Sequence, residues 1–232
     1  MKLKFVHVII LTGLMVTSFS CDGCNQGPPC EKKWQVYQPN PSLIAEIDTV
    51  NTQMSLQCQS MNPTLDDFQG EVFQEYFTGD YNVVAPFSNF VAGPVLPFDG
   101  NPYAEIIMYN SEIPDTVLDT MFVRAGISRD FIYAAVGINI VKKPRLSSTT
   151  SGSFRISKIG NSLVGQTIAG GDTVTKSMSM PFVPVRFAVR MGSFDDSVVS
   201  NTTAIKIDAF NVSGTSGSSL LSDEFKCNSI VY

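Results

Sequence analysis

The stretch "SFRISKIGNSLVGQTIAGGDTVTKSM" (residues 153–178) decides the fold. It consists of short runs of mixed apolar and polar residues, interrupted at Gly160-Asn161 and again at Gly170-Gly171-Asp172. Glycine and asparagine tolerate the positive φ angles that tight hairpin turns require. The stretch therefore predicts three antiparallel strands joined by two tight turns.

The next segment, "PVRFAVRM" (184–191), predicts a half-buried strand, because its residues alternate strictly between two faces. Val185, Phe187, Val189 and Met191 share one face, and Arg186, Ala188 and Arg190 share the other.

Further strands are predicted on the N-terminal side at 103–110, 120–127 and 131–141. Val123, Ala125 and Ile127 alternate with Phe122, Arg124 and Gly126. The run 131–141 is apolar on both faces, which is typical of a central strand covered on each side. Residues 128–130 predict a short turn, and the Gly/Ser-rich segment 213–223 predicts a flexible loop.

Three segments together resemble the C-terminal half of a concanavalin A-like (lectin/glucanase, laminin G-like) β-sandwich: residues 154–178, 183–194 and 204–214, the last with Asp208, Phe210 and Val212 in an Asp-x-Phe pattern. The resemblance extends over residues 65–213. It implies an all-β fold, an antiparallel two-sheet jelly-roll sandwich, and a carbohydrate-binding function. Gln166 and Lys176 stand where the family's hairpin often carries aromatic residues.

The composition fits a folded domain, with 44% hydrophobic and 16% charged residues in 232. The 21 acidic residues exceed the 16 basic ones. Without a basic patch, the sequence argues against a nucleic-acid partner. The predicted order is a signal peptide (1–20), a tether (21–42), a short helix (43–57) and the β-sandwich domain (58–232).

The N-terminus predicts export. Lys2 and Lys4 precede an apolar run over residues 5–16, and Ser20 precedes Cys21. This arrangement resembles a bacterial lipobox, which implies that Cys21 is lipidated and that the protein is an outer-membrane or cell-surface lipoprotein of the cell envelope. Secretion without a lipid and an uncleaved anchor are the alternatives.

Five cysteines are present, and removing Cys21 for the lipid leaves four: Cys24, Cys30, Cys58 and Cys227. An even number in an oxidising compartment predicts two disulfides, for which three connectivities exist. Because the first and last strands of a sandwich often lie close together, we favour Cys58 with Cys227 and Cys24 with Cys30. The pair Cys24 and Cys30 also allows a metal knuckle.

Two N-terminal features have alternative interpretations. Trp34, the only tryptophan, is either an exposed stacking residue or part of an extra strand docked onto the sandwich. Asn40 and Pro41 are typical of a helix start, and the apolar residues after them follow helical spacing: Leu43, Ile47, Val50 and Met54. The predicted helix either binds a partner or packs on the sandwich edge.

The sequence argues against an enzyme. The single histidine, His7, lies in the export signal, which excludes a Ser-His-Asp or Cys-His catalytic set from the mature chain. Glucanases of the resembled family carry Glu-x-Asp-x-Glu on one strand. The nearest match here, Glu46-Ile-Asp48, lacks the third acid.

Ligand-binding candidates are therefore aromatic or acidic. Trp34, Tyr103, Tyr109 and Tyr133 are candidate sugar contacts, although each of the tyrosines is also a candidate core residue. Asp66, Asp67 and Asp80 fall in predicted loops or strand ends, where carboxylates either bind calcium or form turns.

Together these features predict an exported, lipid-anchored envelope protein whose concanavalin A-like domain binds a glycan or a protein partner. The alternative is a structural envelope lipoprotein that docks into a larger assembly without binding carbohydrate.

Overall fold

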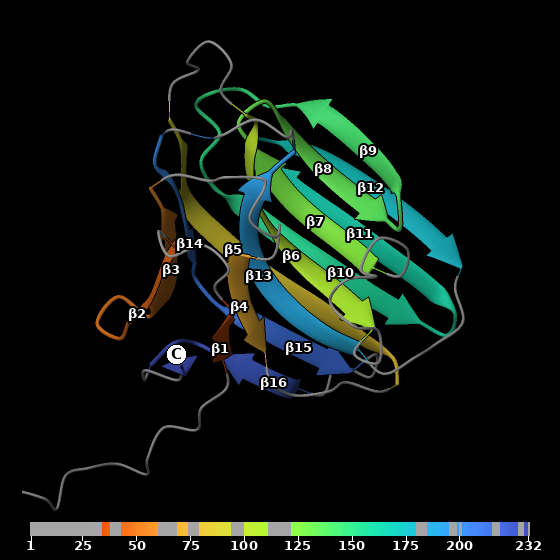
Figure 1. The fold of residues 1–232 in the computed structure, drawn as a ribbon. Coiled ribbons are helices and arrows are strands. Elements are labelled where there is room, and N and C mark those ends of the chain that lie inside the picture. Colours follow the sequence, from red (N-terminus) through yellow and green to blue (C-terminus); the bar gives the residue numbers. More distant parts are fainter. Residues whose placement is uncertain are drawn as a thin grey trace, which may run out of the picture.

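The computed structural model describes residues 34–37, 43–59, 69–73, 79–93, 100–110, 122–179, 185–194, 199, 201–214, 219–226 and 230–231. The regular elements in these ranges are strands, and they form two stacked sheets (Figure 1). None of the described residues belongs to a helix that could span a bilayer. The structure confirms the predicted all-β, two-sheet sandwich.

One of the two sheets has eight strands. Its strands are, in spatial order, β17 (Ile230–Val231), β1 (Trp34–Tyr37), β4 (Gln69–Phe73), β13 (Val185–Ser193), β6 (Pro102–Asn110), β7 (Phe122–Ser128), β8 (Phe131–Val136) and β9 (Asn139–Pro144). All of its pairings are antiparallel except that between β1 and β17, which is parallel.

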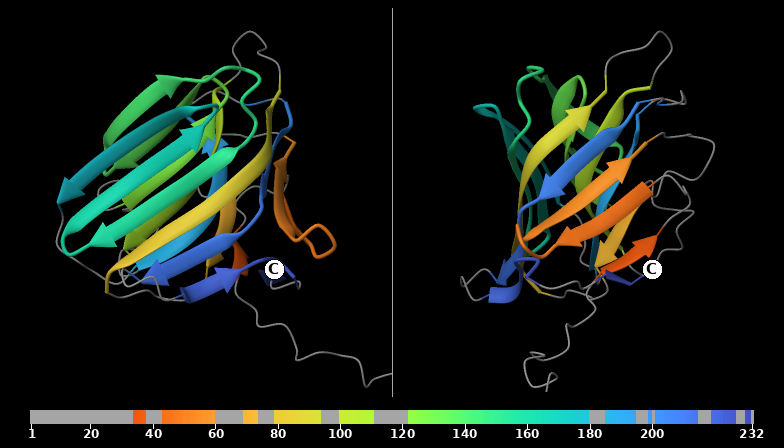
Figure 2. Two further views of the ribbon diagram at one scale, coloured as in Figure 1. Left: turned by 180° about the vertical axis from the view of Figure 1, so that it is seen from behind. Right: turned by 90° about the vertical axis from the view of Figure 1, so that its left-hand side faces the viewer.

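The second sheet has nine strands and lies behind the first (Figure 2, left). Its path is β12 (Asp172–Ser179), β11 (Ser162–Ala169), β10 (Gly152–Ile159), β5 (Tyr81–Ala92), β14 (Thr203–Ile207), β3 (Gln53–Cys58) and β2 (Leu43–Asp48), while β15 (Phe210–Gly214) pairs with β5 and with β16 (Ser219–Asp223). β5 is the long strand of this sheet. It pairs with β10 on one edge and with β14 and β15 on the other.

The hydrophobic core lies between the two sheets. On β5 the buried residues alternate with half-buried ones, and the rings of Phe87 and Phe154 stack at 4.3 Å between centroids. On β6 the core-facing residues are Ala104, Ile106 and Met108. Each large apolar side chain buried here contributes about 1.5–3 kcal/mol relative to an exposed position.

The predicted hairpins of residues 153–178 are confirmed. Ile159 pairs with Ser162 and Ala169 with Asp172, so each turn holds two residues. Gly160, Gly170 and Gly171 all have positive φ angles, which explains the glycines. The alternation predicted for β13 is also confirmed, since Phe187, Val189 and Met191 belong to the core.

The predicted helix at 43–57 is wrong, because this segment is the β2–β3 hairpin. Ala45 and Ile47 are buried at a period of two, and so are Met54, Leu56 and Cys58. Val50 is 88% exposed at the turn. The Asp48 carboxylate accepts hydrogen bonds from the backbone N–H groups of Val50 and Asn51, both at 3.0 Å, and thereby fixes the turn. The apolar residues that follow helical spacing therefore belong to two strands and the turn between them, and their spacing is accidental.

Two further predictions need correction. The single strand predicted at 131–141 is the β8–β9 hairpin, which turns at Gly137 with a φ of 55°. The apolar Ile138, 78% exposed, lies in that turn and conceals it in the sequence. In the predicted loop 213–223, residues 219–223 form β16, which pairs with β15. A Ser/Gly-rich edge strand is difficult to predict from its sequence, because backbone hydrogen bonds rather than alternating apolar side chains keep it in the sheet.

The predicted tether, 21–42, is wrong for residues 34–37. Residues 34–37 form β1, and the Trp34 side chain is fully buried against Phe210 at 5.2 Å and Phe225 at 6.4 Å between centroids. The interpretation of Trp34 as part of a docked strand is therefore the one that the structure supports. Residues 1–33 and 38–42, with the predicted signal peptide and Cys21, lie outside the described residues.

Candidate functional site

The outer face of the eight-stranded sheet carries polar and aromatic side chains. Since residues alternate along a strand, those between the core-facing positions of β6, β7, β8 and β13 point away from the second sheet. Tyr103 and Glu105 of β6 lie on this face. The same face holds Phe122, Arg124, Gly126, Phe131, Tyr133, Arg186 and Arg190.

One row of this face crosses four adjacent strands. Arg190 lies opposite Glu105, Glu105 opposite Gly126, and Gly126 opposite Tyr133. Tyr133 in turn lies opposite Lys142 of β9. A β-carbon built on Gly126 would lie 2.4 Å from the Tyr133 hydroxyl. The glycine is therefore required for the tyrosine ring to reach across β7.

Glu105 is the centre of this row and is fully buried. Its Oε1 forms an ion pair with Nε of Arg190, and its Oε2 accepts a hydrogen bond from the Tyr133 hydroxyl. Nε of Arg124 lies 3.9 Å from Oε2. A buried carboxylate needs such partners, because charge without them is costly away from water.

The network shifts the pKa values of its members. Burial raises the pKa of the Tyr133 phenol well above its usual value, and the negative charge of Glu105 raises it further. Burial by itself would lower the pKa of Arg190, but the Glu105 carboxylate outweighs it and the pKa is raised. Tyr133 is therefore a neutral hydrogen-bond donor and Arg190 a fixed cation.

Arg124 occupies the next row, on the neighbouring outward position of β7. Its guanidinium carbon lies 4.5 Å from the centroid of the Phe122 ring, which places the cation over the aromatic face. The Arg124 side chain is 17% exposed. Its Nε makes no hydrogen bond within the part of the chain that the structure describes.

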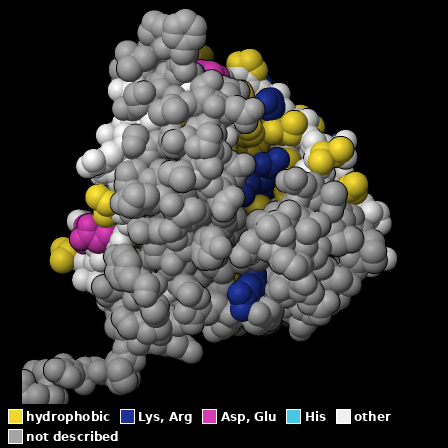
Figure 3. All heavy atoms as spheres, viewed as in Figure 1, with side chains coloured by type: hydrophobic (Ala, Val, Ile, Leu, Met, Phe, Trp, Pro, Cys, Tyr) yellow, Lys and Arg dark blue, Asp and Glu magenta, His cyan; other side chains and the backbone are white. Residues whose placement is uncertain are grey.

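An aromatic cluster borders the Glu105 network. It consists of Tyr103, Phe131, Tyr133 and Phe194, with Phe194 4.7–5.0 Å from the other three ring centroids. The two tyrosines are buried, whereas Phe131 and Phe194 are half-buried. Nζ of Lys142 lies 4.2 Å from the Phe131 ring and 4.9 Å from the Phe194 ring. In Figure 3, Lys and Arg side chains appear beside hydrophobic ones in a strip of this face between regions that are not described.

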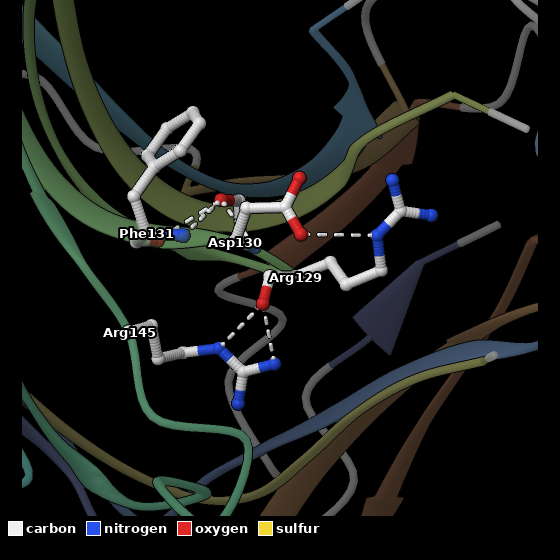
Figure 4. A network of polar contacts seen from close by, with 5 residues as sticks. Arg129, Asp130, Phe131 and Arg145 are labelled. Atoms are coloured by element: carbon white, nitrogen blue, oxygen red, sulfur yellow. Dashed lines mark hydrogen bonds and ion pairs between the residues drawn. The ribbon is translucent and has the colours of Figure 1, made fainter. Parts of the chain in front are cut away.

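The turn before β8 positions Phe131. Ser128 Oγ accepts hydrogen bonds from the backbone N–H groups of Asp130 and Phe131, and it donates one to the Phe131 carbonyl at 2.9 Å. Arg145 donates from Nε and Nη2 to the Arg129 carbonyl at 3.0 and 2.7 Å (Figure 4). The predicted turn at 128–130 is confirmed. The Ser128 hydroxyl and the Arg145 guanidinium both hold it through hydrogen bonds to its backbone.

The structure brings together only some of the predicted ligand contacts. Tyr103 and Tyr133 lie in the same cluster, 6.3 Å apart between ring centroids, outside the core between the sheets. The backbone of Tyr109 belongs to β6, but its side chain lies outside the described part. Trp34 is buried elsewhere and cannot stack on a ligand.

The metal and disulfide predictions are tested only in part. Asp80 accepts hydrogen bonds from Lys158 Nζ at 3.0 Å and from the Gly160 N–H at 2.9 Å, so it serves the β10–β11 turn. Asp66 and Asp67 lie outside the described residues. Among the residues that are described, no group of three His, Cys, Asp or Glu side chains is placed to hold a metal.

Cys58 is buried on β3, whereas Cys21, Cys24, Cys30 and Cys227 lie outside the described ranges. The pairings Cys58 with Cys227 and Cys24 with Cys30 therefore stay predictions.

Sequence reasoning missed Glu105, Arg124, Lys142, Arg190 and Phe194 as site residues. The alternation of β7 and β13 already places Arg124 and Arg190 on the faces opposite the core residues. A count of charged residues on these non-core faces would have indicated the site.

No protein-family model matches the chain, and no curated protein matches it. Solved structures do match, among them three that each share 10% sequence identity with this chain. A functionally unknown protein from Saccharomyces cerevisiae has a TM-score of 0.51 over 78% of this chain and 95% of that chain. The marine PL7 alginate lyase AlyA1 from Zobellia galactanivorans also has 0.51, over 79% and 96%. A sialidase has 0.50 over 79% of this chain, which spans only 17% of the sialidase.

These similarities establish the fold. The chain has a two-sheet jelly-roll sandwich fold of the concanavalin A-like type, as its sequence resemblance implied. Its outer face combines a buried ion-pair network with a partly exposed aromatic cluster.

Proposed function

We propose that the protein is a glycan-binding module and that the outer face of the eight-stranded sheet is its binding surface. The observation that supports this proposal is the aromatic cluster outside the core, with Phe131 and Phe194 half-buried above two buried tyrosines. An aromatic ring that keeps one side accessible can stack on the apolar face of a sugar. Two of the similar structures are an alginate lyase and a sialidase, enzymes that are named for carbohydrate substrates.

The polar groups beneath the cluster favour binding over cleavage. Glycoside hydrolysis by the usual route needs two carboxylates about 5–10 Å apart. Glu105 is the only acidic residue on the outer face of the described positions of β6, β7, β8 and β13. It is fully buried and engaged with Arg190 and Tyr133, so we assign it to positioning rather than to acid–base chemistry.

The proposal includes export and a lipid anchor on Cys21. The support is the sequence of residues 1–21, with its charged start, apolar run and small residue before the cysteine. Mass spectrometry of the native N-terminus tests it. We expect a diacylated cysteine as the first residue, and a free amine at Asp22 or at any later residue would contradict the anchor.

A glycan panel of neutral, uronate-bearing and sulfated chains tests the binding function, with calcium and with EDTA. We expect saturable binding to at least one glycan, and a loss of at least tenfold in affinity for Phe194→Ala. Val141→Ala, an exposed change on β9, is the matched control and keeps the affinity. A folded protein that binds no glycan on the panel would overturn the function and favour a structural envelope protein that docks into an assembly.

A further inference from the structure

The charge on the binding surface is opposite in sign to that of the whole chain. The chain has a formal net charge of −5. The described outer face, in contrast, carries Arg124, Arg186, Arg190 and Lys142 against a single carboxylate, Glu105. A local cluster of one sign creates a potential that attracts ligands of the other sign.

The Glu105 charge is already compensated inside the protein. Glu105 is fully buried and its ion pair with Arg190 leaves the Arg190 side chain only 8% exposed. This pair contributes little net charge to the surface. Positive charge on this surface therefore comes from Arg124, which is half-buried, and from Lys142, which is exposed.

Arg124 has the geometry of a preorganised anion contact. Its guanidinium carbon lies over the Phe122 ring at 4.5 Å, and its Nε is 3.9 Å from Glu105 Oε2, which is beyond hydrogen-bond distance. Stacking on one side and a buried carboxylate behind it restrict the guanidinium. A guanidinium fork matches the two oxygens of a carboxylate or a sulfate better than any neutral hydroxyl.

Lys142 supplies a second cation at the aromatic cluster. Its Nζ lies within 5 Å of the Phe131 and Phe194 ring centroids. Because the ammonium lies over both rings, a sugar that stacks there replaces it and then has the ammonium beside its substituents. The same surface therefore offers apolar contact for a sugar ring and positive charge for an acidic group.

From this arrangement we infer that the ligand is an anionic glycan, whose sugars carry carboxylate or sulfate groups, and that Arg124 contacts the acidic group. The inference rests on the proposed glycan-binding function and specifies its ligand class. A nucleic acid and an anionic membrane are the competing polyanions, and both are outcomes of the test.

The test compares polygalacturonate with its fully methyl-esterified form, chondroitin sulfate with desulfated chondroitin, and both pairs with a neutral glucan. We expect an acidic member to bind at least tenfold more tightly than its neutralised partner and than the glucan. Its affinity should fall at least tenfold between 50 and 500 mM NaCl. Which acidic member binds distinguishes a carboxylate from a sulfate ligand.

The matched variants are Arg124→Gln and Arg155→Gln. Arg155 is exposed on β10 of the other sheet, so its replacement changes the net charge equally without touching the surface. We expect Arg124→Gln to weaken binding of the acidic glycan at least tenfold, Arg155→Gln to leave it within twofold, and Arg124→Lys to restore part of it. Trp34 fluorescence verifies that each variant is folded.

Several outcomes would overturn the inference. Equal binding of charged and neutralised glycans would refute the ligand class while leaving the binding function intact. Equal losses in Arg124→Gln and Arg155→Gln would show general charge attraction instead of a contact. Binding of single-stranded DNA or of phosphatidylglycerol vesicles as tightly as the glycan would show an unselective polyanion surface. Failure to bind any glycan would refute the proposed function itself.

Discussion

At the scale of single residues, the candidate site depends on one buried carboxylate. Glu105 lies directly opposite Arg190 of β13 on one side and Gly126 of β7 on the other. Arg190 and Tyr133 both direct their polar atoms at it. The role of Glu105 is to fix the positions of the side chains around it, which lie closer to the surface than its own carboxylate.

Replacing Glu105 tests this role. Glu105→Gln keeps the shape but removes the charge beside the buried Arg190, so we expect the free energy of unfolding to fall by about 3–5 kcal/mol. Urea unfolding followed by Trp34 fluorescence measures it. The double variant Glu105→Met/Arg190→Met removes both charges and should be less destabilised than Glu105→Gln. An unchanged urea midpoint for Glu105→Gln would contradict the role.

A second residue-scale prediction concerns Asp80 and pH. The hydrogen bond from Lys158, and a further one from the Gly160 N–H, lower the pKa of Asp80. A carboxyl whose pKa is lower in the folded state stabilises the fold above its unfolded pKa of about 3.9, and that contribution is lost as the pH falls through the lower, folded value. Asp80→Asn should therefore lower the Tm at pH 7, with a difference that shrinks below about pH 4.

Thermal unfolding between pH 3 and pH 7 measures this difference. Asp172→Asn is the control, since Asp172 pairs with Lys143 where both side chains are well exposed, and such pairs contribute little. A Tm difference between wild type and Asp80→Asn that stays constant over the whole range would refute the assignment.

At the scale of elements, β11 supports the site from behind. A β-carbon built on Gly165 would lie 2.6 Å from the Arg124 carbonyl and 3.4 Å from the Ala135 carbonyl. Thr167 Oγ1 donates a hydrogen bond to the Tyr133 carbonyl at 2.7 Å. The second sheet therefore touches the backbone of the strands that carry Arg124 and Tyr133.

Gly165→Ala tests this close approach. Because the obstructing atoms belong to the backbone, the sheets must separate, and we expect a loss of about 1–3 kcal/mol in the free energy of unfolding. Glycan affinity should fall as well. The neighbouring Gln166→Ala, half-buried on the opposite side of β11, should change stability by less than about 0.5 kcal/mol. Equal effects of the two changes would contradict the proposed support.

The same scale explains which elements could be predicted. The β10–β11–β12 hairpins were predictable because their turns are local and marked by Gly160, Gly170 and Gly171. The β2–β3 hairpin was not, because Ile47, Val50 and Met54 satisfy helical spacing while only the sandwich decides which of them is buried. β8 and β9 merged into one prediction because Ile138 is apolar and yet lies in a turn.

The candidate site was less predictable than the fold. Its members come from separate strands, and Glu105 meets Arg190 across 85 residues of sequence. Alternation places each residue on the outer face, but only the strand order brings β13 beside β6. Tyr103 and Tyr133 could be chosen as candidate contacts because they are aromatic. The charged residues around them could be found only from the pairing register of the strands.

At the scale of the whole molecule, Trp34 joins the beginning of the described chain to both sheets. It belongs to β1 of the eight-stranded sheet, and its ring contacts Phe210 of β15 edge-on at 5.2 Å. As the single tryptophan it reports on this junction without interference from other indoles. The junction therefore has its own spectroscopic probe.

We expect the Trp34 emission of the native protein to be blue-shifted and protected from acrylamide, and both properties to be lost on unfolding. Trp34→Ala should cost about 3–5 kcal/mol, the usual loss for a large buried aromatic side chain. Trp34→Phe, which keeps most of the apolar contact, should cost less. Strong acrylamide quenching in the native state would contradict the burial of Trp34.

The parallel pairing of β1 with β17 has a practical consequence. Trp34 lies opposite Ile230, so the first and last described strands share one margin of the eight-stranded sheet, and β9 lies at the other margin. Immobilisation through either terminus, on a sensor chip or on a bilayer, would hold the molecule by the same side. Arg124 and Lys142, several strands away, would then remain open to incoming polymer whichever terminus is used.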